Sequence, residues 1–121
     1  MRENIKSQRQ LRVGEQLKHL ISEIITLRNF KSEKIRETII TVTEVSVSPD
    51  LKKAEIFVIS RDNKKNFIKY LNAEVFIFKK EISKKLNLRF TPHLIFRFDD
   101  TFEYANKIEK ILKEPKVIKD L

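Results

Sequence analysis

The sequence predicts an α+β fold in which helices cover one face of a three-stranded sheet. Apolar residues recur at helical spacing in two long segments, and three shorter segments are rich in β-branched and aromatic residues. These segments run in the order helix, strand, strand, helix, strand, with a further helix at the end. A chain of 121 residues has the usual length of one domain. We therefore expect one domain over residues 1–113 and a short charged tail over residues 114–121.

The first helix is expected between Ile5 and Leu27, because its apolar residues lie three or four positions apart and charged residues fill the other faces. The apolar positions are Val13, Leu17, Leu20, Ile21, Ile24 and Ile25. The polar stretch RNFKSEKIRE follows and is assigned no helix or strand of its own.

A hairpin follows, with strands expected over Thr38–Ser48 and Ala54–Ser60. Its turn contains Pro49, which fixes φ and lacks an N–H donor, and Asp50, whose carboxylate accepts hydrogen bonds from nearby backbone amides. Both residues are expected to shape the turn and to have no chemical role.

A long second helix is expected after Asp62, which would cap it. One apolar stripe runs along this segment through Phe67, Leu71, Val75, Phe78, Ile82 and Leu86. The segment before Pro92 ends the helix, because proline disfavours helical geometry in the residue before it. The alternating HLIFRFD segment is then the third strand, and the crossover is long enough for it to lie parallel to the second.

A final helix is expected from Thr101 to Lys113. The acidic residues Asp99, Asp100 and Glu103 lie at its start and raise the alternative of a cation site. An aspartate that ends a strand just before a helix is better explained as a helix cap.

The chain is strongly basic, with 26 Lys and Arg against 17 Asp and Glu, a formal net charge of +9 and a pI near 9.8. Such a field attracts polyanions, and nucleic acid is the first partner to consider. A lysine-rich composition also keeps a protein soluble, so charge alone leaves both interpretations open.

Several classes of protein are disfavoured by the composition. The absence of cysteine excludes disulfides, thiolate nucleophiles and Cys-type zinc sites, and suits a reducing compartment. We expect a cytoplasmic protein, since the sequence has neither the apolar core of a signal peptide nor a membrane span. His19 and His93 are the only histidines, and no phosphate-binding glycine loop or metal-ligand spacing is present. No enzyme activity, metal or cofactor is therefore expected.

Three stretches in order resemble the ribosome-binding factor A family, bacterial assembly factors of the small ribosomal subunit. They are RQLRVGEQLKHLISEII, SPDLKKAEIFVIS and EISKKLNLRFTPHLIFRFDD, and the resemblance extends from about Arg9 to Leu112. Its most specific parts are Ser48–Leu51 followed by Ala54, and Leu88–Pro92 followed by Leu94, Phe96 and Asp99. The resemblance implies a KH-like domain of the second type, and a monomer that binds the precursor of the small subunit and its ribosomal RNA during late maturation. It implies no small-molecule substrate and no membrane partner.

The sequence departs from the family at a kink in the long helical segment, where the family usually has Ala-x-Gly in place of the Gly-x-x-Gly loop of ordinary KH domains. The aligned triplet here is Glu74, Val75 and Phe76, and Gly14 is the only glycine of the chain. An ordinary KH loop is therefore excluded. Any bend between residues 73 and 76 has to come from packing or a bulge, because residues 63–86 contain neither Gly nor Pro.

The face of the second helix opposite its apolar stripe is the predicted RNA-binding surface. It carries a lysine cluster with Asn72, Ser83 and the aromatic Phe76, whose ring either stacks on an unpaired base or packs under the N-terminal arm. Arg9 and Arg12 lie one helical turn apart and either join this surface or are ordinary surface charges. The predicted RNA-binding residues are Arg9, Arg12, Lys69, Phe76, Lys79, Lys80, Lys84, Lys85 and Arg89.

Two functional hypotheses follow. The first is a non-catalytic assembly factor that holds ribosomal RNA electrostatically. The second is a protein–protein adaptor that uses the open face of the sheet, where Phe57 and Ile59, or the residues alternating with them, would be exposed. Only the first predicts binding that weakens steeply as salt rises.

Overall fold

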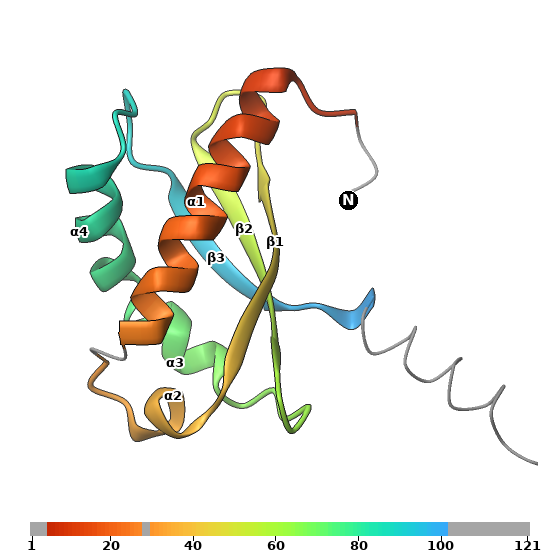
Figure 1. Ribbon diagram of the computed structural model, residues 1–121, viewed down its shortest axis with the longest axis vertical. Coiled ribbons are helices and arrows are strands. Elements are labelled where there is room, and N and C mark those ends of the chain that lie inside the picture. Colours follow the sequence, from red (N-terminus) through yellow and green to blue (C-terminus); the bar gives the residue numbers. More distant parts are fainter. Residues whose placement is uncertain (1–4, 28–29, 102–121) are drawn as a thin grey trace, which may run out of the picture.

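The computed structural model describes residues 5–27 and 30–101 (Figure 1). The elements in chain order are α1 (Gln8–Leu27), α2 (Glu33–Glu37), β1 (Ile40–Val47), β2 (Lys53–Ser60), α3 (Ile68–Ala73), α4 (Val75–Lys85) and β3 (His93–Phe98). The predicted final helix beyond Thr101, the acidic residue Glu103 and the tail over residues 114–121 lie outside the described residues.

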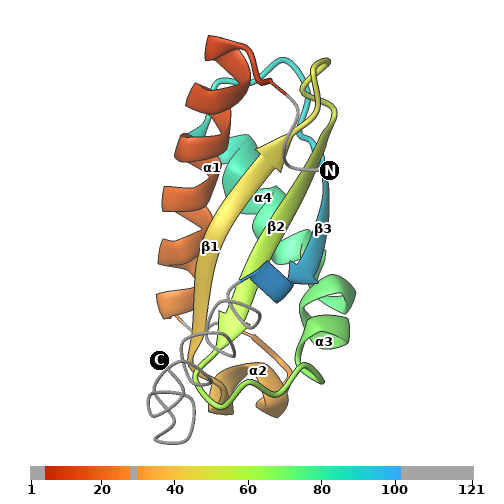
Figure 2. The same ribbon diagram turned by 90° about the vertical axis from the view of Figure 1, so that its right-hand side faces the viewer.

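The sheet has the strand order β1–β2–β3, with β1 antiparallel and β3 parallel to the central strand. Figures 1 and 2 show α1, α3 and α4 on one face of the sheet. The predicted α+β architecture and the parallel third strand are both confirmed. The register between β1 and β2 shifts between Val42 and Glu44, which is a β-bulge.

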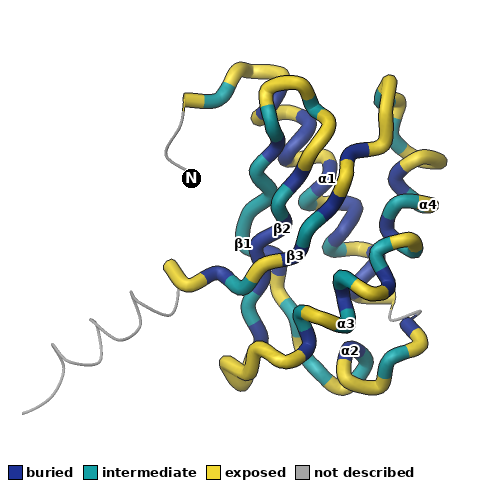
Figure 3. The backbone as a smooth tube through the Cα atoms, turned by 180° about the vertical axis from the view of Figure 1, so that it is seen from behind, coloured by how far each residue is buried: buried dark blue, intermediate teal, exposed yellow. Residues whose placement is uncertain are grey.

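The core lies between the sheet and the helices, as the buried segments in Figure 3 show. Every second residue of β2 and β3 points into it, and Ile56, Val58, Leu94 and Phe96 are buried there. Phe78 of α4 packs against Phe96 of β3 with ring centroids 4.8 Å apart, and against Phe30 at 5.4 Å. The apolar stripes predicted for the two helical segments are thus the side chains that hold the helices to the sheet.

The start of α1 is fixed by a reciprocal capping box. The N–H of Ser7 donates to Oε1 of Gln10 (2.9 Å), and the N–H of Gln10 donates to Oγ of Ser7 (3.1 Å). The side-chain amide of Gln10 also donates to the carbonyl of Val47 at the end of β1 (2.8 Å). Arg9 lies between Ser7 and Gln10 in the sequence. The bond from Gln10 to Val47 therefore also fixes the helix turn that carries Arg9 relative to the sheet.

Gly14 allows α1 to lie close to β1. A Cβ at this position would lie 2.9 Å from the carbonyl oxygen of Val45, which belongs to the strand backbone. The glycine is therefore required by the short distance between helix and sheet.

The prediction of one continuous helix after Asp62 is wrong, because the segment breaks at Glu74 into α3 and α4. Glu74 has φ −106° and ψ 25°, outside helical geometry. Its buried carboxylate accepts hydrogen bonds from the N–H groups of Lys31 (2.8 Å) and Ser32 (3.0 Å). The bend thus comes from a packing contact, as the absence of Gly and Pro requires.

Two smaller expectations are also corrected. The RNFKSEKIRE stretch contains the short helix α2, which buries Ile35 in the core. Asp62 does not cap the next helix, because Phe67 occupies the cap position. Oδ1 of Asp62 instead accepts a hydrogen bond from the N–H of Lys64 (3.2 Å) and forms a turn. Among the described residues, no helix has the length and apolar character needed to cross a bilayer.

Candidate nucleic-acid interface

The helix α4 separates its core residues from its charged residues. Phe78 and Ile82 have no exposed surface, whereas Lys80, Lys84 and Lys85 are exposed and Lys79 is half-buried. A helix with this division presents ammonium groups to solvent without weakening its packing. Lys80 and Lys84 therefore lie on the side of α4 opposite Phe78 and Ile82. Lys85 instead lines a hollow with residues of α1, among them Glu15 and Glu23.

The charges of this helix are largely uncompensated. In the described part of the chain, neither Lys80 nor Lys84 forms an ion pair, and Lys85 lies 3.9 Å from Glu81, the limit for such a pair. Lys84 and Lys85 belong to the last turn of α4, where cations also stabilise the helix dipole. Lys79 and Lys80 have no such structural role.

Phe76 stands on the first turn of α4 with 55% of its surface exposed. This exposure contradicts packing under the N-terminal arm and leaves the ring accessible for stacking. Asn72 was expected on the same exposed face as Phe76. Its side chain instead turns to β3, where the amide nitrogen donates to the carbonyl of Phe96 (3.1 Å) and the amide oxygen accepts from the N–H of Phe96 (2.8 Å). Asn72 therefore fastens α3 to the sheet.

The break at Glu74 places Lys69 on a different helix from the other lysines. Lys69 is exposed on α3, with its ammonium group 5.2 Å from the ring centroid of Tyr70. Arg12 is exposed on α1, and within the described residues it forms no ion pair. Lys69 and Arg12 therefore lie on other helices than Lys79, Lys80, Lys84 and Lys85.

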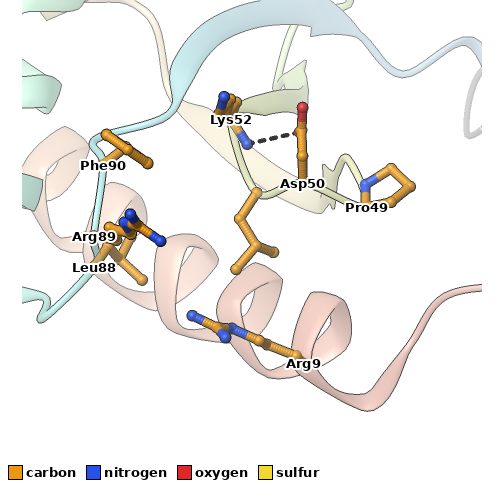
Figure 4. A pocket seen from close by; sticks show the side chains of 8 residues that line it. Arg9, Pro49, Asp50, Lys52, Leu88, Arg89 and Phe90 are labelled. Atoms are coloured by element: carbon orange, nitrogen blue, oxygen red, sulfur yellow. Dashed lines mark hydrogen bonds between the residues drawn. The ribbon is translucent and has the colours of Figure 1, made fainter.

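Arg9 and Arg89 meet in a hollow of about 450 Å³ at the end of the molecule where α1 begins. The other walls of this hollow, which we call the turn pocket, are the β1–β2 turn and the loop between α4 and β3 (Figure 4). Its lining residues are Arg9, Pro49, Asp50, Leu51, Lys52, Leu88, Arg89 and Phe90. Arg9 reaches from α1 toward the loop that carries Leu88 and Arg89 (Figure 4).

The β1–β2 turn is held by its own hydrogen bonds. Asp50 Oδ1 accepts from the hydroxyl of Ser48 (2.7 Å) and from the N–H of Lys52 (3.0 Å), as predicted for this residue. These two bonds, the Ser48 contact first, hold the pKa of Asp50 below its usual range. Leu51 adopts the left-handed conformation with φ 62°, and the N–H of His93 donates to the carbonyl of Lys52 (2.8 Å). The turn and the start of β3 therefore form one connected frame.

Lys52 and Phe90 belong to this site and were not predicted to do so. Phe90 is 54% exposed, with the Lys52 ammonium 5.5 Å and the Arg89 guanidinium 5.4 Å from its ring centroid. In the sequence, Phe90 marks only the end of a helix and Lys52 only a turn. Their proximity depends on the parallel pairing of β2 with β3, which places Lys53 opposite His93.

The open face of the sheet does not present the expected apolar side chains. Phe57 is only 8% exposed, and Ile59 is half-buried. Glu55 and Arg97 form an ion pair across this face at 2.6 Å. The expectation of an exposed Phe57 is therefore wrong, whereas Ile59, the other residue named for the adaptor hypothesis, is partly exposed.

The acidic group after β3 is used within the fold. Asp99 is buried; its Oδ1 accepts from the N–H of Thr101 (3.0 Å) and its Oδ2 accepts from the hydroxyl of Thr43. Asp100 pairs with Lys65 at 3.3 Å. The bond with Thr101 is the contact expected of a cap, and the helix that Asp99 would cap lies outside the described residues. Over residues 5–27 and 30–101, no cluster of His, Asp and Glu could hold a metal ion.

Comparison with known proteins identifies the family. The model of the ribosome-binding factor A family matches residues 9–112. This chain belongs to the ribosome-binding factor A family. Ribosome-binding factor A of Bradyrhizobium diazoefficiens is 41% identical over 117 residues, covering 95% of this chain and 81% of that protein. The protein of the same name from Pelagibacter ubique is 40% identical over 110 residues, covering 89% of this chain and 90% of its own length.

Solved structures of the family have the same fold. The crystal structure of ribosome-binding factor A from Thermus thermophilus superposes with a TM-score of 0.62 at 18% identity, covering 73% of this chain and 93% of that one. A solution NMR structure from Thermotoga maritima gives a TM-score of 0.63 at 21% identity, with 77% and 89% covered. The KH-like fold expected from the sequence is thus confirmed.

The break lies at the first residue of the triplet Glu74, Val75 and Phe76, where the family usually has Ala-x-Gly. The hydrogen bonds of Glu74 to Lys31 and Ser32 hold the bend without that glycine.

Proposed function

We propose that this protein binds ribosomes, and that its target is the precursor of the small ribosomal subunit together with its ribosomal RNA. It assists late processing of that RNA and maturation of the subunit without catalysing a reaction. We expect it to act as a monomer in the cytoplasm, where subunits are assembled. Membership of the ribosome-binding factor A family supports this proposal.

The observation that carries the proposal is the face of α4. Its exposed lysines include Lys80 and Lys84, which form no ion pair within the part of the chain that the structure describes. Buried residues on the opposite side of the same helix hold it rigidly against the sheet. Ammonium groups on a fixed helix attract a phosphate backbone and release its counterions on binding, which supplies affinity without requiring a particular base sequence.

Co-sedimentation tests the proposal. The full chain is centrifuged with precursor small subunits, mature small subunits and large subunits at low and high salt. We expect the protein to pellet with precursor subunits at low salt and to be released as salt rises, because electrostatic contacts with RNA weaken in salt. Equal recovery with all three particles, or binding that does not respond to salt, would count against it.

A further inference from the structure

We propose that the turn pocket binds one unstacked nucleotide of single-stranded RNA, with its base on the ring of Phe90 and an adjacent phosphate between Arg9 and Arg89. This inference rests on the proposed function and adds a contact with a defined chemistry, at a place distinct from the face of α4. It also assigns a role to two residues, Lys52 and Phe90.

The pocket has a suitable size and composition for a nucleotide. Its volume of about 450 Å³ falls in the range of roughly 300–1,000 Å³ that small-ligand sites have. It combines an aromatic ring that is 54% exposed with three cationic side chains, those of Arg9, Lys52 and Arg89. Aromatic rings that stack bases beside cations that hold phosphates are the pattern of single-strand binding sites.

The three cations are available to a ligand. In the described residues, none of Arg9, Lys52 and Arg89 is in an ion pair. The one acidic residue of the pocket, Asp50, directs its carboxylate to the Lys52 backbone (Figure 4). A phosphate is therefore expected on the Arg9 and Arg89 side, where two guanidinium groups offer paired N–H donors.

The ring of Phe90 can change partners at little cost. The ammonium of Lys52 and the guanidinium of Arg89 lie 5.5 and 5.4 Å from its centroid, near the outer limit of about 6 Å for a cation–π contact. Exposed contacts of this kind are weaker than base stacking. A base can therefore displace one of them, and the released cation remains close to the phosphates of the ligand.

The walls of the pocket are pre-organised. The capping box of Ser7 and Gln10 fixes the first turn of α1, which carries Arg9. The hydrogen bonds of Asp50 fix the β1–β2 turn, which carries Lys52. The bond from the N–H of His93 to the carbonyl of Lys52 fixes the end of the loop between α4 and β3. Binding thus orders few groups, which favours affinity. An acidic peptide would satisfy the cations but would leave the ring without a partner, so RNA fits the pocket better.

A single-tryptophan reporter tests this directly, because the chain contains no Trp. The full chain with Phe90→Trp is titrated with hexauridylate, a blunt twelve-base-pair RNA duplex and hexaglutamate. We expect hexauridylate to quench the fluorescence in a saturable manner, and the duplex and the peptide to leave it unchanged, because only the first offers an unpaired base. The control is Ile39→Trp, an exposed position 45% accessible before β1, which should not be quenched.

Two companion variants measure the contributions of ring and charge. Phe90→Leu should weaken hexauridylate binding about tenfold in fluorescence anisotropy, as loss of one stacked base does, and Phe90→Tyr should retain it. Arg9→Gln in the reporter background should lower the salt slope by about 0.7, the value for one phosphate contact on a single strand. Lys34→Gln, an exposed lysine of α2 far from the pocket, should leave the slope unchanged.

The outcomes separate this inference from the proposed function. Absence of quenching by hexauridylate, with precursor subunits still bound in a salt-dependent manner, would overturn the nucleotide pocket alone. Equal quenching by hexaglutamate would make the pocket a general anion site and overturn the base contact. Failure of the parent protein to bind precursor subunits would overturn the proposed function, whatever the reporter shows.

Discussion

The carboxylate of Glu74 accepts a hydrogen bond from the N–H of Ser32, 3.0 Å away and 42 residues earlier in the chain. A second bond from the N–H of Lys31 completes the contact at 2.8 Å. The break between α3 and α4 is thereby joined to the connection between α1 and α2. The buried carboxylate of Glu74 thus holds a bend in a segment that contains neither Gly nor Pro.

Replacing Glu74 tests whether this contact holds the bend. Glu74→Ala leaves two backbone donors without their acceptor, and we expect a loss of about 2–4 kcal/mol in the free energy of unfolding, because bonds to a charged acceptor are strong. Glu74→Gln keeps one acceptor oxygen and should lose less. Urea denaturation measures both, with Glu81→Ala as a control that removes only a surface ion pair. A parent-like stability for Glu74→Ala would show that the bend has another cause.

Gly14→Ala tests the close approach of α1 to the sheet. Alanine favours a helix over glycine by about 1 kcal/mol. The new methyl group would nevertheless meet the carbonyl oxygen of Val45 at 2.9 Å. We expect a net destabilisation of about 1–3 kcal/mol, as overpacking against a backbone causes. Gln16→Ala on an exposed part of α1 is the control, and a stabilised Gly14→Ala variant would contradict the close packing.

The apolar stripe of α3 and α4 is expected to carry the stability of the fold. Leu71 and Ile82 lie on opposite sides of the break and neither has exposed surface. Replacing either with Ala should cost about 2–5 kcal/mol through reduced burial and the cavity left behind. Thermal or urea unfolding measures this, and Leu11→Ala at an exposed position of α1 should have little effect. A loss of less than about 0.5 kcal/mol at Leu71 or Ile82 would remove that residue from the core.

The long apolar stripe illustrates how far sequence reasoning reaches. Its periodicity from Phe67 to Leu86 predicts which residues are buried, and most of them are. It does not predict the break, because the spacing continues across Glu74 and the bonds that hold the bend come from Lys31 and Ser32. The same limit applies to α2, a five-residue helix that exists because Ile35 reaches the core.

The candidate site could likewise be predicted from the sequence only in part. Lys80 and Lys84 are predictable, since both lie on the side of the helix opposite its apolar stripe. The turn pocket is not, because Arg9, Lys52 and Phe90 come from three separate segments that meet only in the folded chain. The sequence shows that Arg89 and Phe90 are adjacent, but the exposure of Phe90 appears only in the structure.

Phe76 has a separate prediction. Because its ring is 55% exposed, Phe76→Ala should change the free energy of unfolding by no more than about 0.5 kcal/mol. If the ring stacks on a base of the precursor, affinity for precursor subunits should fall by about tenfold, with the salt slope unchanged. Phe76→Tyr keeps a ring and should bind like the parent. Equal affinities for all three proteins would exclude Phe76 from the interface.

The most direct test of the account is the salt dependence of precursor-subunit binding by the double variant Lys80→Glu and Lys84→Glu. Both lysines are exposed and without ion pairs in the described residues, so we expect stability to change by no more than about 0.5 kcal/mol per substitution. Affinity should fall much further, and the slope of log affinity against log salt should flatten by about one unit for each phosphate that no longer binds a lysine. A folded double variant that binds precursor subunits with the affinity and salt slope of the parent would contradict the assignment of α4 as the RNA-binding face.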